Sequence, residues 1–242
     1  MLIRVVTVCR NSEKTIKRTI ESVLHQTYKE IEYIIIDGAS TDDTVKIIKS
    51  YQESFYKKGY HYVYLSEQDN GIYDAMNKGI SLAQGELIGI INSDDWYELN
   101  AVECAVVHYL DMGYDLFYAD LRIIGRDSVF IKKAKNGRII TSRYWNHPTT
   151  FIPKRINDKY KYKNEKIHDD RDLILRIRKD GAKVCVVNNV LANFTRNGIT
   201  HSKNIRKALQ RAHIKYKIYR DNHYSIFYAI ECYGMEIAKL II

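Results

Sequence analysis

The sequence predicts an α/β fold with a mostly parallel sheet and helices on both of its faces. Two observations lead to this prediction. Short segments rich in Val, Ile and Leu alternate with amphipathic helical segments through residues 1–100. The last of these apolar segments, residues 87–91 (LIGII), contains no polar side chain, which is typical of a central parallel strand that is covered on both faces.

Four strands joined by three helices are expected in the first half of the chain. Ser12 opens the first helix, and Thr41 or Asp42 can cap the second. The third helix is expected over residues 71–83. The expected strands are residues 2–8, 32–36, 62–65 and 87–91.

The pattern becomes less regular after Asn100. Further helices are expected over residues 101–112 and 169–179 and from His201 to the end, and a polar loop over residues 134–142. Further strands are expected over residues 115–124, 129–133, 147–152 and 184–187. We therefore expect one domain over residues 1–200, with halves of residues 1–100 and 101–200, and a helical C-terminal extension, residues 201–242.

Composition limits the classes of protein to which the chain can belong. Its 242 residues carry a net charge of +9, which allows nucleic acid, an anionic membrane surface or a phosphorylated substrate as the partner. The four cysteines are widely spaced, which argues against a zinc site or a disulfide framework and for a reducing compartment. No signal peptide or membrane span is expected, so the predicted location is cytoplasmic.

Polar and acidic residues follow each strand of the first half. These segments are Cys9 to Asn11, Asp37 to Ser40, Glu67 to Asp69 and Asn92 to Asp95. In an open parallel sheet, ligands bind at the carboxyl ends of the strands. The sequence therefore predicts a ligand site at this edge of the sheet.

Two of these segments carry carboxylates suited to particular ligands. Asp94 and Asp95 together can hold a hard divalent cation and a ribose hydroxyl, although a solvated turn is the alternative. Asp37 can accept a hydrogen bond from a base or from a ribose, while Ser40 and Thr41 can cap the next helix.

The helix that begins at Gly71 carries a polar face. Asp74, Asn77 and Lys78 lie three and four residues apart, so they share one side, and the helix N-terminus with Lys78 favours a phosphate or sugar oxygen. An ordinary capped helix is the alternative. The sequence contains neither GxGxxG nor GxxxxGK[ST], so a bound diphosphate needs a metal to neutralise much of its charge.

These motifs resemble family 2 glycosyltransferases, which are inverting enzymes with the GT-A fold, a Rossmann-like sheet. The matching segments cover most of residues 3–200, and the GIYDAMNKG form is most similar to enzymes that build bacterial surface polysaccharides such as O-antigen, capsule or colanic acid. The segments are VVTVCRNSEKTIKRTIESVLHQTY, IEYIIIDGASTDDT, SEQDNGIYDAMNKGISLAQGELIGIINSDDW, HPTTFIPK and HDDRDLILRI.

The resemblance implies a role for each matching residue. Asp37 contacts the base, Asp94 lies near the ribose, and Asp95 binds the Mg²⁺ or Mn²⁺ that holds the diphosphate. Residues 1–100 form the half that binds the nucleotide-sugar, and residues 101–200 the half that binds the acceptor. The other residues implied in the nucleotide-sugar pocket are Thr7, Arg10, Asn11, Asp69, Gly71, Asp74, Asn77 and Lys78.

The general base is implied to lie in HDDRD, which contains three candidate acids, Asp169, Asp170 and Asp172. We choose Asp170 because the following Leu and Arg then match the family's pattern. The sequence departs from that pattern at Gly38, which replaces a frequent second Asp, and at Ser93, so that Asp95 must be the main metal ligand.

Two histidines and the C-terminal extension leave alternatives open. His201 is either a further metal ligand or a surface residue, and His147 lies either on the acceptor side or in a structural position. The extension, residues 203–242, is basic and then amphipathic, which favours contact with an anionic membrane surface. Packing on the domain, or a homodimer contact, is the alternative.

The expected function is therefore transfer of a sugar, with inversion, from a nucleoside-diphosphate sugar, with UDP as the expected nucleotide. The acceptor is expected to be a hydroxyl of a glycan or of a polyprenyl-linked molecule, used in bacterial surface-polysaccharide synthesis. One alternative is a nucleotidyltransferase, but only one Arg and no Gly follow the first strand. The other is a nucleic-acid-binding protein, against which the acidic strand ends argue, so no nucleic-acid partner is expected.

Overall fold

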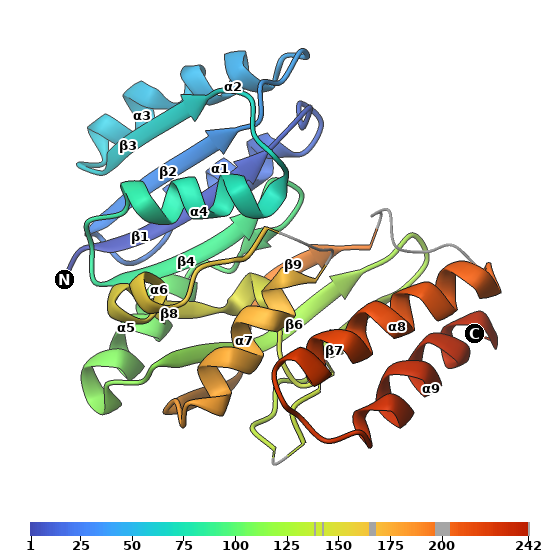
Figure 1. Ribbon diagram of the computed structural model, residues 1–242. Helices are drawn as coiled ribbons and strands as arrows, with labels where there is room; N and C mark the ends of the chain where they lie inside the picture. The colour runs from blue at the N-terminus through green and yellow to red at the C-terminus, as the bar shows by residue number, and fades with distance from the viewer. Residues whose placement is uncertain (138, 142, 165–167, 197–203, 242) are drawn as a thin grey trace.

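The computed structural model describes residues 1–242 except 138, 142, 165–167, 197–203 and 242. The first half confirms the predicted alternation of strands and helices (Figure 1). The helix expected from Thr41 or Asp42 is divided in two at Tyr51. The elements are β1 (Ile3–Cys9), α1 (Ile16–Leu24), β2 (Ile31–Asp37), α2 (Thr44–Ser50), α3 (Gln52–Lys57), β3 (His61–Ser66), α4 (Ile72–Leu82) and β4 (Leu87–Asn92).

In the second half, strands and helices do not alternate regularly. The strand expected over residues 184–187 continues to Thr195, and the C-terminal extension contains two helices. The elements are β5 (Trp96–Tyr97), α5 (Ala101–Met112), β6 (Leu116–Ile124), β7 (Val129–Lys132), the 3₁₀ turn η1 (His147–Thr149), β8 (Phe151–Pro153), α6 (Lys154–Lys159), α7 (Asp169–Lys179), β9 (Val184–Thr195), α8 (Ile205–Asp221) and α9 (Tyr228–Ile241).

A single sheet runs through both halves in the order β3-β2-β1-β4-β8-β6-β9-β5, with β7 beside β6. The pairs β2–β3, β1–β2 and β1–β4 are parallel, as predicted. Beyond β4 the pairing is mixed, since β8 is antiparallel to both β4 and β6, whereas β6 and β9 are parallel. The carboxyl ends of β1, β2, β3 and β4 therefore meet at one edge.

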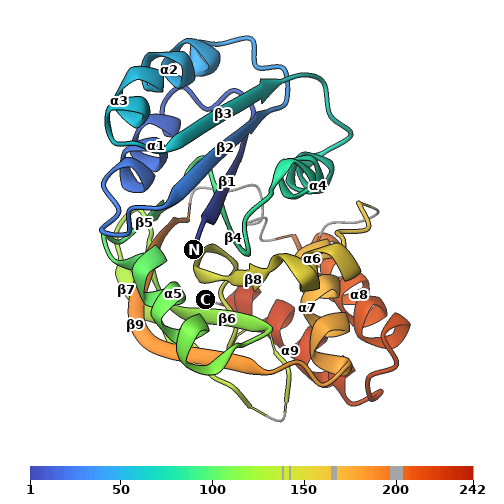
Figure 2. The same ribbon diagram turned by 90° about the vertical axis from the view of Figure 1, so that its left-hand side faces the viewer.

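Helices cover both faces of the sheet, as predicted (Figure 2). One apolar core lies under α1, α2, α3 and α5, and a second lies under α4 and α7. Gly79 allows α4 to lie close to β1, because an added Cβ there would stand 2.3 Å from a methyl group of Val6. This close packing brings the start of α4 to the carboxyl ends of the strands.

The antiparallel helices α8 and α9 lie against α7 (Figure 1). A small apolar cluster joins Leu175 of α7 to Ile218 and Tyr219 of α8 and to Cys232 of α9. Buried Glu236 of α9 forms an ion pair with Arg211 of α8 at 2.8 Å and also contacts Lys215. Within the described part of the chain, no helix is both long and apolar enough to span a bilayer.

Candidate active site

A cavity of about 870 Å³ opens at the carboxyl ends of β1 and β4. The cavity lies at the edge of the sheet where ligands bind in open parallel sheets. Five of the residues expected in the nucleotide-sugar pocket line it, namely Arg10, Asn11, Asp69, Gly71 and Asp94. Further lining residues include Ser12, Lys14, Thr15, Asn92 and Ser93.

The loops after β1 and β2 are joined through Asn11, which adopts a left-handed backbone conformation with φ of 49°. Its N–H donates to the hydroxyl of Ser40 at 2.7 Å, and its side-chain oxygen accepts from the N–H of Thr41 at 2.9 Å. One wall of the cavity is therefore held by hydrogen bonds between two strand ends.

Thr7 and Asp37 are fully buried and do not line the cavity. Thr7 is fully buried and accepts a hydrogen bond from Tyr33 at 2.9 Å, so its place in the nucleotide pocket stays a prediction. Alternate residues of a strand point to opposite faces, and Thr7 points with Val5 into the core under α1. Asp37 is also fully buried, and it accepts hydrogen bonds from the N–H of Ser40 at 3.0 Å and the hydroxyl of Ser66 at 2.6 Å.

The structure explains why residue 38 is a glycine. An added Cβ at Gly38 would stand only 2.4 Å from Oδ2 of Asp69. Asp69 is held there by the N–H of Gly71, which donates to its Oδ1 at 2.9 Å from a backbone with φ of 118°. A carboxylate from the loop before α4 therefore occupies the space that a side chain at position 38 would need.

The Asp94–Asp95 turn follows β4, whose last residue is Asn92. Asp95 is fully buried, and its Oδ1 accepts from the N–H of Thr195 at 3.2 Å. Its Oδ2, like Oδ1 of Asn92, is buried without a hydrogen-bond partner among the described residues. Burial, reinforced by the charge of Asp94, raises the pKa of Asp95 well above its usual range. Burial also raises the pKa of Asp94, whose side chain lines the cavity.

Arg18 and Thr195 support this turn, and no pattern in the sequence indicated either of them. The guanidinium of Arg18 lies 3.4 Å from the ring centroid of Trp96 and donates to the carbonyl of Asp94 at 3.2 Å. The hydroxyl of Thr195 donates to the same carbonyl at 3.0 Å. Thr195 ends β9, a hundred residues along the chain, so only the folded sheet brings it here.

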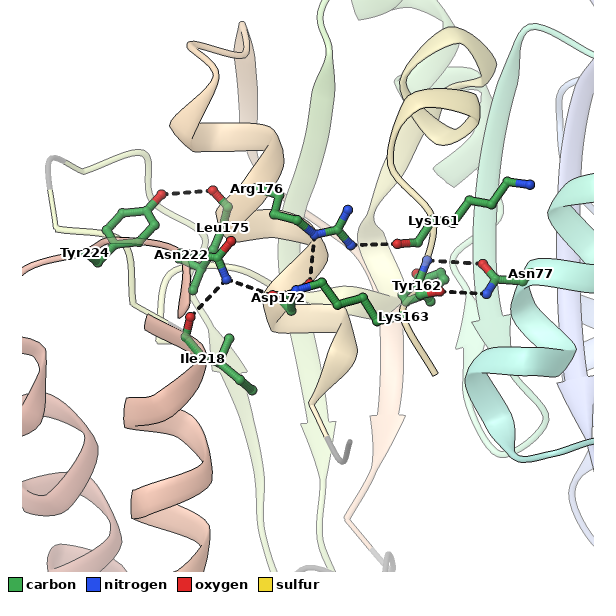
Figure 3. Close-up of polar contacts among 10 residues, drawn as sticks. All are labelled: Asn77, Lys161, Tyr162, Lys163, Asp172, Leu175, Arg176, Ile218, Asn222 and Tyr224. Atoms are coloured by element: carbon green, nitrogen blue, oxygen red, sulfur yellow. Dashed lines mark hydrogen bonds and ion pairs between the residues drawn. The ribbon is translucent and has the colours of Figure 1, made fainter. Parts of the chain in front are cut away.

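The polar face of α4 lies outside the cavity lining. Lys78 pairs with Glu67 at 2.8 Å and with Asp74 at 3.5 Å. The side chain of Asn77 donates to the carbonyl of Tyr162 at 2.8 Å and accepts from the N–H of Tyr162 at 3.1 Å (Figure 3). Both ends of the Asn77 amide therefore bind the backbone of the other half, and the place of Asn77 in the nucleotide-sugar pocket stays a prediction.

The three acids of HDDRD differ in what surrounds them. Asp172 is buried and accepts hydrogen bonds from Asn222 at 2.7 Å, Arg176 at 2.8 Å and Lys163 at 3.1 Å (Figure 3). Asp169 is buried in the first turn of α7. Asp170 is half-buried and accepts a hydrogen bond from the hydroxyl of Tyr73 at 3.1 Å. Asp170 is therefore the partly exposed acid of the three, and Tyr73 is its side-chain partner among the described residues.

A family model described as Glycosyl transferase family 2 matches residues 4–169. The chain belongs to this family.

Individual relatives agree with this assignment. Chondroitin synthase of Escherichia coli is 27% identical over 241 residues, which is 89% of this glycosyltransferase and 30% of that relative. The glycosyltransferase therefore spans less than a third of that relative's length.

Solved structures share the GT-A fold. S. aureus TarS in complex with UDP-GlcNAc superposes with a TM-score of 0.73 at 17% identity, over 99% of this chain and 72% of that one. The mannosyltransferase PcManGT from Pyrobaculum calidifontis, in complex with GDP-Man and Mn²⁺, superposes with a TM-score of 0.70 at 14% identity, over 99% and 74% of the two chains.

His147 of the glycosyltransferase lies beside Asp170. Both residues line a small internal cavity of about 10 Å³ together with Trp145 and Tyr162. The Nε2 atom of His147 lies 3.4 Å from the hydroxyl of Tyr162, and burial lowers the pKa of His147 below its usual value. His147 is therefore a neutral group next to the candidate base. The second predicted histidine, His201, lies outside the described residues.

Asp172→Asn is expected to lower the free energy of unfolding by about 2 kcal/mol, because it removes a buried charge that pairs with Lys163 and Arg176. The loss is limited because both of these partners are partly exposed to solvent. Burial alone would raise the pKa of Asp172, but hydrogen bonds from Asn222, Arg176 and Lys163 outweigh it and the net pKa is lowered. Because the pKa of Asp172 is lower in the folded than in the unfolded protein, its ionised form stabilises the folded state. This stabilisation is complete when the pH is above the unfolded-state pKa of about 3.9. It is lost as the pH falls through the folded-state pKa.

Urea unfolding of the wild type and Asp172→Asn across this pH range measures the effect. The difference in stability is expected to be full at neutral pH and to shrink under acid conditions. Asp158→Asn, which removes an exposed partner of Lys154, is the matched control and should change stability little. Equal stability of Asp172→Asn and wild type at neutral pH would contradict a structural role for Asp172.

Proposed function

We propose that this glycosyltransferase moves a sugar from a nucleoside-diphosphate sugar, with UDP as the expected nucleotide, to a hydroxyl of a glycan or lipid-linked acceptor. The transfer inverts the anomeric centre and serves bacterial surface-polysaccharide synthesis. The observation that carries the proposal is the presence of two separate carboxylate sites. One is the Asp94–Asp95 turn at the large cavity. The other is Asp170 on α7, which lines the small cavity with His147 and Tyr162. The likeness to chondroitin synthase and to TarS supports a polysaccharide product and a UDP-sugar donor.

The donor set of the turn fits a hard divalent cation. Asp95 Oδ2 and Asn92 Oδ1 are buried oxygens that lack hydrogen-bond partners among the described residues, and oxygen atoms of this kind are what Mg²⁺ and Mn²⁺ accept as ligands. We propose that Asp95 holds the ion, with His201 as a further ligand. When bound, the cation neutralises the diphosphate and stabilises the charge of the leaving group. The likeness to PcManGT, which binds Mn²⁺, supports this assignment.

The remaining groups have separate tasks in the proposed mechanism. Arg10, Asn11 and Asp69 bind the nucleotide from the wall of the cavity, and Asp94 contacts the ribose. Asp170 accepts the proton of the acceptor hydroxyl as this oxygen attacks the anomeric carbon. Attack on the face opposite the departing diphosphate gives one displacement and therefore inversion.

Calorimetric titration with UDP and GDP, with and without Mn²⁺, followed by product analysis with UDP-sugars and oligosaccharide acceptors, tests this function. Metal-dependent binding of one nucleotide and a product of inverted anomeric configuration are expected. Absence of binding for UDP, GDP, dTDP and CMP by a folded protein, together with absence of transfer, would reject the proposal.

We further propose that the C-terminal extension contacts an anionic membrane surface, which would suit a lipid-linked acceptor. Phe227, just before α9, and Ile230, in its first turn, are 73% and 74% exposed. Lys217 and Arg220, near the end of α8 that precedes them, are exposed basic residues. Apolar side chains that are flanked by basic residues favour such a surface.

Replacing both Phe227 and Ile230 with Ser is expected to weaken binding to vesicles that contain phosphatidylglycerol by at least about tenfold, because two large apolar side chains lose a buried environment. Co-sedimentation with these vesicles and with neutral phosphatidylcholine vesicles measures the effect. Tyr56→Ser, which alters an 81% exposed aromatic residue on α3, is the control. Dimerisation through this face, seen by light scattering and lost in the double variant, would instead support a homodimer contact.

A further inference from the structure

Tyr73 forms a direct hydrogen bond between the two halves of the molecule. It lies in the first turn of α4, and its hydroxyl is 3.1 Å from Oδ1 of Asp170 in the first turn of α7. Burial raises the pKa of Tyr73 above its usual range, so the phenol keeps its proton and acts as the donor throughout the working pH range. Residues from separate halves of the chain therefore meet at the candidate base.

The ring of Tyr73 is held in place from two directions. It stacks on Tyr162 with ring centroids 5.3 Å apart and an interplanar angle of 24°. The backbone of Tyr162 is bound in turn by both ends of the Asn77 amide, one helical turn after Tyr73 (Figure 3). Helix α4 contains Tyr73, and through Asn77 it also binds Tyr162, on which the Tyr73 ring stacks. The Tyr73 hydroxyl is therefore held in position next to Asp170.

This geometry leaves one oxygen of the carboxylate for chemistry. Tyr73 binds Oδ1 of Asp170, and no described residue forms a hydrogen bond with Oδ2. A carboxylate that is bonded at one oxygen is restricted in rotation and offers its second oxygen in a defined direction. Among the described residues, the other titratable groups with an electrostatic interaction with Asp170 include His147, Tyr162 and His168.

We propose that Tyr73 is a positioning residue that holds the Asp170 carboxylate so that its Oδ2 faces the acceptor hydroxyl. This inference rests on the proposed function, in which Asp170 is the base. This role explains why a tyrosine lies at the start of α4, the helix that borders the large cavity. Through its hydroxyl, Tyr73 connects the half that binds the donor to Asp170, the proposed base for the acceptor. The phenol does not exchange its proton in the reaction.

Tyr73→Phe and Tyr162→Phe separate positioning from packing. Both variants keep the stacked rings and lose a single hydroxyl group. The hydroxyl of Tyr73 binds Asp170, whereas that of Tyr162 lies 3.4 Å from His147. Tyr162→Phe is therefore a matched control for the loss of a buried phenol at the same stack.

We expect Tyr73→Phe to lower kcat by about tenfold, the effect of losing one hydrogen bond to a charged group. The KM for the donor and the calorimetric affinity for the nucleotide should stay at the wild-type values, because Tyr73 does not line the large cavity. Tyr162→Phe is expected to lower kcat less than Tyr73→Phe does, because its hydroxyl does not bind Asp170, and thermal melting should show that both variants are folded.

The outcomes distinguish this inference from the function on which it rests. If Asp170→Asn is inactive while Tyr73→Phe keeps the wild-type kcat, the positioning role is wrong and the base assignment stands. An equal loss in Tyr162→Phe would also overturn it, because packing of the pair would then be responsible. If wild type transfers no sugar, or if Asp170→Asn is fully active, the proposed function itself fails.

Discussion

Asp95→Asn is expected to abolish metal-dependent binding of the nucleotide, with a loss of affinity greater than about 100-fold, because the variant removes the charged ligand of the cation. Asn has the same shape and keeps an oxygen for the N–H of Thr195, so the turn should remain folded. The expected consequence is a loss of transfer at any donor concentration that can be tested. Calorimetry with UDP and Mn²⁺, paired with a transfer assay, measures both effects.

The same substitution is expected to stabilise the protein in the absence of metal. Asp95 places a carboxylate oxygen in a fully buried position without a partner among the described residues, which costs folding free energy. A neutral amide costs less to bury, and a gain of about 1 kcal/mol would raise Tm by roughly 2–4 °C. At a ligand-binding site, a substitution that removes the binding group is expected to raise the stability of the unliganded protein while it lowers activity.

Asp127→Asn serves as the matched control, because Asp127 is an exposed acid in the turn between β6 and β7. It should alter neither nucleotide binding nor melting. Retention of Mn²⁺-dependent UDP binding by Asp95→Asn would show that the cation is held elsewhere, and the assignment of Asp95 would be withdrawn.

Asp170→Asn is expected to reduce kcat by roughly 10²–10⁴-fold, the usual contribution of a positioned general base. Binding of the donor should persist, since Asp170 lies outside the lining of the large cavity. Steady-state kinetics with varied donor and acceptor, together with calorimetry on the same preparation, separate these two effects.

The neighbouring acids give the comparison that this prediction needs. Asp172→Asn should lose stability, since three side chains bind Asp172, and any loss of activity should follow the fraction of unfolded protein. A loss of kcat in Asp172→Asn without a loss of stability, together with a mild effect in Asp170→Asn, would reverse the assignment.

The sequence predicted best where strands are buried on both faces. Residues 2–8 and 87–91 are nearly continuous apolar segments, and both are strands with the parallel pairing that was expected. The prediction ended β9 too early, at Val187, because Asn188 and Asn189 resemble the end of a strand. In the structure the sheet changes register there, and Asn188 bonds to buried Asp120 at 3.2 Å, so the polar residues continue the strand.

Sequence motifs located the site but did not show which face each residue takes. Arg10, Asp69 and Asp94 line the cavity because they lie in loops at strand ends, where every side chain is near the ligand edge. Thr7 and Asn77 lie within regular elements, where the direction of a side chain is set by packing. The partner of Asn77 is 85 residues away, and a pairing at that distance leaves no periodic pattern in the chain.

The amide of Asn77 has a consequence for how relatives of this enzyme could diverge. It binds the backbone N–H and C=O of residue 162, not the side chain, and every residue except proline offers both groups. Substitutions in the segment around Tyr162 can therefore accumulate without loosening its attachment to α4. A chimera that keeps residues 1–100 and takes residues 101–200 from a relative should inherit the connection intact, so the second half can be exchanged while the first half is left unchanged.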